Sequence, residues 1–281
     1  MTADRLQDAP RRPFSRWLIV VIVFCALLVI AFYAVRDAAY LEHDHTLVGA
    51  DWFGYAVCHR ITERSFMING RQLPLCARCT GMYLGAALAV LSLWLSGRIR
   101  YTALPSLPIL LTLLGFIAIM GVDGLNSYSH FFPNAPHLYQ PRNWLRLLTG
   151  MGTGLAMGAI ILPTLVQTLW CQGEFRPSIS TFRELFGLLL VGGTAVFLVL
   201  SNQPIILYVL ALISVVGLLT IVTALNTVTM LILSRRESLA VTWQQASLPL
   251  LLGAALAVIE LSIISWLRFY LTGTMVGLPG L

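Results

Sequence analysis

Long apolar runs recur along almost the whole 281-residue chain, and they constrain its fold more than any other feature. A helix needs about 20 apolar residues to cross the hydrocarbon core of a bilayer. Hydrophobic residues make up 58% of the chain and charged residues only 11%, where soluble domains average about a quarter charged residues. The sequence therefore predicts an all-α integral membrane protein and leaves no stretch for a separate soluble domain.

The apolar runs predict about seven transmembrane helices within one polytopic membrane domain, residues 1–281. The first, Trp17–Val35, is longer than the apolar region of a signal peptide and has no small-residue cleavage site after it, so we expect it to be retained. The other six are expected at Cys79–Ser96, Leu104–Val122, Trp144–Leu169, Leu185–Leu200, Ile205–Leu233 and Ser247–Leu271.

Arginine supplies all 18 basic residues, and the net charge is +6. Arginines beside transmembrane helices orient a protein, because cytoplasmic loops are enriched in positive charge. A basic segment precedes the first helix, and the loops that contain Arg98, Arg176 and Arg235 fall on the same side of the membrane. We therefore expect a cytoplasmic amino terminus, the lipid bilayer as the main partner and no nucleic-acid partner.

Glycines recur at four-residue spacing in two of the expected helices. Gly81 and Gly85 lie in the second helix, and Gly150, Gly154 and Gly158 lie in the fourth. Small residues at this spacing let the backbones of membrane helices approach closely. The pattern predicts tight packing of both helices against neighbours.

Three of the five cysteines lie close together in CHRITERSFMINGRQLPLCARC, residues 58–79. Cys76 and Cys79 are three residues apart and can share one helical face, and Cys58 stands directly before His59. Thiolate and imidazole groups are the ligands that zinc and several other transition metals prefer. Cys58, His59, Cys76 and Cys79 are therefore candidate metal ligands.

Two other interpretations of these cysteines remain open. Cys76 and Cys79 lie at the start of a helix, where the thiolate form is favoured, and this is typical of a thiol–disulfide pair. An oxidising outer compartment would favour such a disulfide over a zinc thiolate site. Free cysteines are also often buried without any chemical role.

Several arginines near the cysteines are candidate anion-binding residues, because guanidinium groups bind phosphate and carboxylate through paired hydrogen bonds. The alternative is that each arginine extends to lipid headgroups or pairs with an acidic residue. Asp123, near the end of the third expected helix, is the candidate catalytic residue, able to orient an arginine, hold a metal or move a proton. The candidate anion-binding residues are Arg60, Arg64, Arg78, Arg142 and Arg146.

Four sequence elements in this order resemble the DUF2085 family of prokaryotic membrane proteins. They are CHRITERS, PLCARCTG, DG at residues 123–124 and NWLRLLTG from Asn143, and the resemblance covers about residues 55–160. It implies a multi-pass protein of the prokaryotic cytoplasmic membrane and implies no reaction. Helices 17–35 and 185–271 lie outside it. The positions that it marks are Cys58, His59, Arg64, Pro74, Cys76, Arg78, Cys79, Gly81, Asp123, Asn143, Arg146 and Gly150.

Three functions fit this sequence. In the leading hypothesis, a metal held by the Cys/His motif braces an arginine-lined site for an anion or a lipid phosphate at the outer membrane face. In the second, Cys76 and Cys79 act as a thiol–disulfide oxidoreductase coupled to a membrane quinone. In the third, the protein is a structural or assembly subunit.

Overall fold

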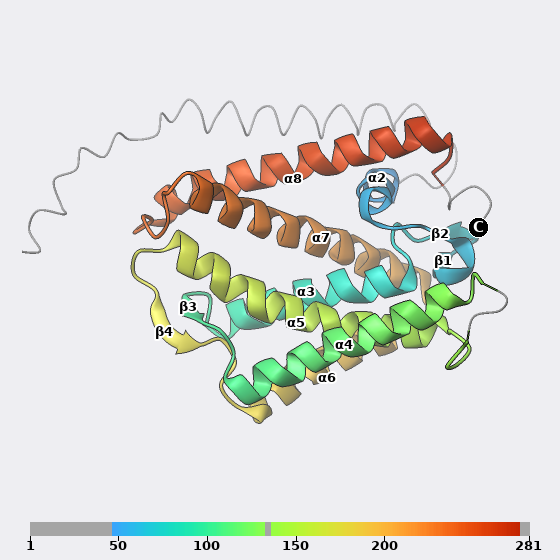
Figure 1. Cartoon of the computed structure of the whole chain (residues 1–281), viewed down its shortest axis with the longest axis horizontal. Helices are drawn as coiled ribbons and strands as arrows, with labels where there is room; N and C mark the ends of the chain where they lie inside the picture. Colours follow the sequence, from blue (N-terminus) through green and yellow to red (C-terminus); the bar gives the residue numbers. More distant parts are fainter. Residues whose placement is uncertain (1–46, 133–135, 276–281) are drawn as a thin grey trace, which may run out of the picture.

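The computed structural model describes residues 47–132 and 136–275, and the helix expected at Trp17–Val35 lies outside them. The described part is built mainly of helices that run along one another (Figure 1). Six of these helices are long and apolar enough to cross a membrane. They are α3 (Ala77–Leu95), α4 (Leu107–Ser129), α5 (Asn143–Leu169), α6 (Phe182–Leu200), α7 (Pro204–Leu233) and α8 (Trp243–Thr272).

Each of these six helices overlaps one of the six later spans expected from hydropathy, so the all-α membrane class is confirmed. The largest difference between an expected and an observed helix end is at α4. The sequence predicts an end at Val122, and the helix continues to Ser129. Hydropathy falls there because Asp123, Asn126 and Ser127 are polar. All three side chains are buried and hydrogen-bonded, so the helix continues through them.

Helices α3 and α5 are in backbone contact along the glycines singled out in the sequence. A Cβ atom at Gly81 or Gly85 would lie less than 3.0 Å from backbone atoms of α5, and one at Gly150 or Gly154 would meet the backbone of α3 in the same way. The prediction of close packing is confirmed, and the two glycine-bearing helices turn out to be each other's partners.

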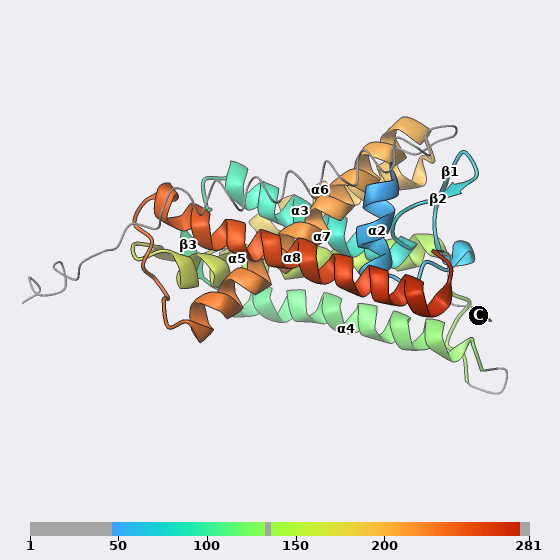
Figure 2. The same cartoon turned by 90° about the horizontal axis from the view of Figure 1, so that it is seen from above.

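Short elements gather at one end of the bundle, which we call the site end (Figures 1 and 2). They are α2 (Val48–Val57), the 3₁₀ turn η3 (Thr62–Arg64) and the antiparallel strands β1 (Met67–Ile68) and β2 (Arg71–Gln72). Asn69 and Gly70 join the strands with positive φ angles of 48° and 83°, as a two-residue Asn-Gly hairpin turn requires. The sequence pattern predicted neither α2 nor this hairpin.

The opposite end of the bundle contains β3 (Tyr101–Ala103) paired in parallel with β4 (Glu174–Pro177). Arg98 forms a two-pronged ion pair with Glu184 there, with distances of 2.7 and 2.8 Å. The guanidinium of Arg100 lies 4.2 Å from the Trp170 ring centroid. The loops that contain Arg98, Arg176 and Arg235, which the sequence places on one side of the membrane, therefore lie together at this end of the bundle.

Candidate metal and anion site

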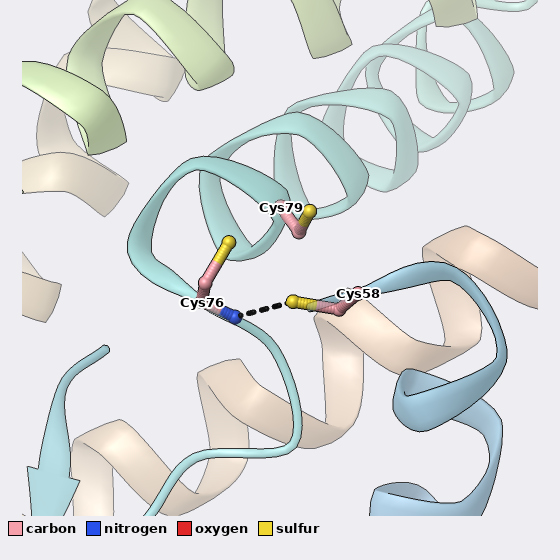
Figure 3. A group of neighbouring side chains, drawn as sticks. All are labelled: Cys58, Cys76 and Cys79. Atoms are coloured by element: carbon pink, nitrogen blue, oxygen red, sulfur yellow. Dashed lines mark hydrogen bonds between the residues drawn. The ribbon is translucent and has the colours of Figure 1, made fainter. Parts of the chain in front are cut away.

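The three cysteines of the sequence motif converge at the site end. Cys58 follows α2 directly, Cys76 is the N-cap residue of α3, and Cys79 lies in the first turn of α3 (Figure 3). Their Sγ atoms all lie within 4.8 Å of one another. Cys58 and Cys76 are each 1% exposed, while Cys79 is partly exposed. Cys171 is exposed and follows α5 at the opposite end, and Cys25 lies outside the described residues.

Two backbone amides donate hydrogen bonds to the sulfur of Cys58. The Cys76 N–H lies 3.1 Å from this Sγ, and the Arg60 N–H lies 3.5 Å from it. Arg60 has a positive φ of 50°, a conformation that non-glycine residues adopt at a cost. N–H donors directed at a sulfur stabilise its thiolate, which is the form that binds metals.

The thiols differ in their tendency to ionise. Hydrogen bonding with the Cys58 and Cys79 thiols holds the pKa of Cys76 well below its usual range. The interaction with the Cys76 thiol, together with burial, outweighs the hydrogen bond from the Cys76 amide and raises the pKa of Cys58 to about 12.

The cysteine geometry fits a metal ion. A tetrahedral zinc site with Zn–S bonds of about 2.3 Å requires sulfurs about 3.8 Å apart, which small rotations would reach from the present arrangement. His59 is not part of the group of side chains within 4.8 Å of one another. Its Nε2 is buried without a hydrogen-bond partner among the described residues, and burial lowers the pKa of its imidazole, which favours the neutral form that binds metals.

Arg78 and Asp123 form an ion pair beside the cysteines, in which the Asp123 side chain is 1% exposed and the Arg78 side chain 18% exposed. Arg78 is the second residue of α3, and its Nε and Nη2 both donate to Oδ2 of Asp123 in α4. Nη2 also donates to the Ser127 hydroxyl at 3.0 Å. The other carboxylate oxygen of Asp123 accepts a 2.8 Å bond from the Tyr139 hydroxyl. Asp123 is thus held by α3 and by the segment before α5, and it lies within α4, not at its end.

Arg64 and Arg146 complete a cluster of three arginines around this pair. Arg64 donates to the Ser127 carbonyl at 3.2 Å and lies over the Phe131 ring. Arg146, 7% exposed, donates to the Asn143 side chain at 2.8 Å, and its Nε is buried without a partner. Burial and the charge of Arg78 lower the pKa of the Arg64 guanidinium.

Positive charge exceeds negative charge in this cluster. Across the described ranges, neither Arg64 nor Arg146 belongs to an ion pair, and the buried carboxylate of Asp123 is engaged by Arg78. The positive charges of Arg64, Arg78 and Arg146 all act on the imidazole of His59, and those of Arg64 and Arg78 act on Arg146. Such an arrangement attracts an anion.

Two of the five candidate anion-binding arginines lie apart from this cluster. Arg60 pairs with Asp51 of α2 at 3.0 Å, and Arg71 pairs with the other oxygen of the same carboxylate at 2.6 Å. Arg142 is the exposed N-cap residue of α5. The structure therefore brings together Arg64, Arg78 and Arg146.

The sequence motif did not reveal Arg268, which lies near the end of α8. Its Nη1 donates to the carbonyls of Tyr55 and Cys58 at 2.7 and 2.5 Å, and its Nη2 donates to that of His59 at 3.3 Å. The guanidinium also lies 4.1 Å from the Tyr55 ring centroid. Arg268 donates hydrogen bonds to carbonyl oxygens that have no partner within the helix at the end of α2. These bonds hold the backbone of Cys58 in place.

These features define a polytopic helical membrane protein whose thiol cluster and arginine cluster adjoin at one end of the bundle. The chain belongs to the DUF2085 family, whose model carries the description "Predicted membrane protein" and matches residues 58–160. The matched segment begins at Cys58 and contains every candidate ligand and anion-binding residue, whereas Arg268 and helices α6 to α8 lie beyond it.

Two similar proteins come from archaea. The chain is 38% identical over 85 residues to an uncharacterized protein of Methanothermobacter thermautotrophicus, an alignment that covers 76% of that protein and 28% of this chain. It is 26% identical over 114 residues to an uncharacterized protein of Methanocaldococcus jannaschii, covering 67% of that protein and 41% of this chain. No solved structure matches the chain significantly.

Proposed function

We propose that Cys58, His59, Cys76 and Cys79 hold a metal ion, with zinc the best match, and that this centre braces a site for an anionic ligand. The ligand is bound by Arg64, Arg78 and Arg146, and a phosphate group suits their paired donors. Asp123 orients Arg78 within this site. One observation carries the proposal: three arginines lie beside three converging sulfurs. Arg78 is in an ion pair with Asp123, whereas Arg64 and Arg146 have no ion pair within the described residues.

The metal and the arginines have complementary tasks in this proposal. A metal fixes the loop between α2 and α3, which carries Arg64, because it joins Cys58 at one end of the loop to Cys76 and Cys79 at the other. A side chain that binds an anion needs such support when it lies on a loop, because a loop positions its side chains less precisely than a helix does. The neutral imidazole of His59 supplies a fourth ligand after a rotation toward the sulfurs.

Elemental analysis of the purified full-length protein tests the metal centre, together with counting of free thiols before and after reduction. We expect one metal per chain and protected cysteines at positions 58, 76 and 79. Cys79→Ser should lose most of the metal, whereas Cys171→Ser should retain it, because Cys171 is exposed at the other end of the bundle. Metal-free protein, or equal metal loss in both variants, would contradict the proposal.

Binding of inorganic phosphate tests the anion site. Arg146→Lys should weaken binding at least about tenfold, since lysine cannot form paired hydrogen bonds. Arg142→Lys is the matched control, because Arg142 lies one helical turn away and is exposed. If both variants bind phosphate like the wild type, the arginines serve packing, and the structural or assembly role becomes the better explanation.

The oxidoreductase alternative is favoured by the proximity of the same three sulfurs and by the partial exposure of Cys79. In that reaction, the Cys76 and Cys79 thiols would form a disulfide, and two electrons and two protons would reduce a quinone to a quinol. A metal-free protein with a reducible disulfide in the thiol analysis would support this alternative.

A further inference from the structure

The anion site lies close to the ends of the helices that form it. Arg78 is the second residue of α3 and Arg146 the fourth residue of α5, while Asp123 lies six residues before the end of α4 at Ser129. Nearby, Tyr128 and Trp144 are exposed by 62% and 46%. Tyrosine and tryptophan gather at the level of lipid headgroups. The depth of the arginine cluster therefore matches that of lipid phosphates.

One donor of Arg78 remains available for a ligand. Its Nε and Nη2 are used by Asp123 and Ser127, while Nη1 donates no hydrogen bond within the described residues. Gly124 of α4 lies beside it, and a Cβ atom at Gly124 would have Nη1 as its one neighbour within 4 Å, at 4.0 Å. A glycine at this position leaves the guanidinium uncovered.

The surface around Gly124 is apolar and exposed. Met120 and Tyr128 lie one turn before and one turn after Gly124 on the same face of α4; Met120 is partly exposed and Tyr128 is 62% exposed. A water-soluble anion would have to approach past these side chains, whereas the acyl chains of a lipid would pack on them. The opening at Gly124 therefore faces the side of the bundle that lipids contact.

We propose that the ligand of this site is the phosphate of a membrane lipid, which reaches Arg78 from the side of the bundle at Gly124. This inference rests on the proposed anion site and names the source of its ligand. The phosphate receives hydrogen bonds from Nη1 of Arg78 and from the guanidinium groups of Arg64 and Arg146, while the acyl chains remain in the bilayer against α4.

The test compares Gly124→Val with Gly121→Val, which changes a glycine one turn earlier on α4. A Cβ atom at Gly121 would have nothing within 4 Å. Delipidated full-length protein is titrated with phosphatidic acid, and the retained lipid is counted by native mass spectrometry. Gly124→Val should weaken lipid binding about tenfold or more, because its methyl groups cover Nη1. Gly121→Val should stay within about twofold of the wild type.

Titration with inorganic phosphate separates this inference from the proposed function. If phosphate binds the wild type but phosphatidic acid does not, a free anion is the ligand and the inference is wrong. If Gly124→Val binds phosphatidic acid like the wild type, lipid does not reach Arg78 at Gly124 and the inference is wrong as well. If neither probe binds the wild type, the anion site itself is wrong. Unchanged metal content and thermal unfolding of Gly124→Val show that the variant is folded, and Gly124→Ala provides a smaller blocking group if it is not.

Discussion

At the scale of single residues, Asp123 supplies the one buried carboxylate among the three clustered arginines of the described structure. A buried charge that loses its partner is costly, by about 3 to 5 kcal/mol in soluble proteins. The interaction of Asp123 with Arg78 therefore stabilises the fold, besides the role that we propose for it in the anion site. In the proposed site, the carboxylate of Asp123 offsets part of the positive charge of the arginines and would weaken their attraction for a second anion.

Replacement of Asp123 separates these two effects. Asp123→Asn keeps the shape of the side chain but leaves Arg78 without a counter-charge, so we expect a loss of about 3 kcal/mol in stability. Added phosphate should restore part of this loss, because it supplies the missing negative charge and binds only the folded state. Thermal unfolding with and without phosphate measures both effects.

Glu63→Gln is the control for this experiment, because Glu63 is an exposed acidic residue on η3 near the same cluster. It should unfold like the wild type at every phosphate concentration. Equal stability of Asp123→Asn and the wild type would contradict the counter-charge role of Asp123.

The residues of the site were predictable from the sequence to different degrees. Cys58, Cys76 and Cys79 were recognised because their spacing is a property of the chain itself. The sequence did not show that Arg60, unlike Arg64, lies apart from the arginine cluster. The partner of Arg60 is Asp51, which lies on a helix that the hydropathy pattern did not predict. Arg268 was missed because more than 200 residues separate it from the backbone that it binds.

At the scale of elements, α8 and α2 form a unit that supports Cys58. Besides the three bonds of Arg268, the Ser265 hydroxyl donates to the Trp52 carbonyl at 2.5 Å, and the Tyr55 hydroxyl donates to the Thr274 carbonyl at 2.7 Å. A helix outside the family-matching segment thus fixes the position of one proposed metal ligand.

Replacement of Arg268 should weaken metal binding even though Arg268 is no ligand. Residues that orient metal ligands typically contribute 10-fold to 100-fold in affinity. We therefore expect Arg268→Gln to bind Co²⁺ about tenfold more weakly, with a changed thiolate-to-metal absorption band. Arg183→Gln, at an exposed position in α6, should leave the affinity and the band unchanged. Wild-type affinity and an unaltered band in Arg268→Gln would show that α8 supports the fold alone.

Element boundaries were predictable where apolar runs meet polar loops, as at the carboxyl ends of α5 and α7. They were not predictable where polar residues are satisfied inside the bundle. The last turns of α4 are the main example, since hydropathy measures side chains against water and takes no account of an ion pair with another helix.

At the scale of the whole molecule, the two ends of the bundle differ in chemistry. The site end carries the thiols and the arginine cluster, while the other end carries β3, β4 and the exposed Cys171. The basic segment before Trp17 predicts that the amino terminus is cytoplasmic, which would place Cys171 inside the cell and the site outside.

Cysteine labelling with a membrane-impermeant maleimide tests this orientation. Cys171 should react only after the cells are permeabilised. A cysteine introduced at the exposed site-end position by Glu63→Cys should react in intact cells. The reverse pattern would place the thiol and arginine clusters on the cytoplasmic face and would show that the orientation prediction is wrong.

The glycine contacts between α3 and α5 have a mechanical consequence. Because the two backbones touch, α3 and α5 cannot slide or tilt against each other without a steric clash. Arg78 and Arg146, one on each helix, are therefore fixed on a single rigid body, and the spacing between their attachment points is constant. A transition between two shapes of this protein must place its hinge elsewhere, and the loop that carries Arg64 is the part of the site that such a motion would displace.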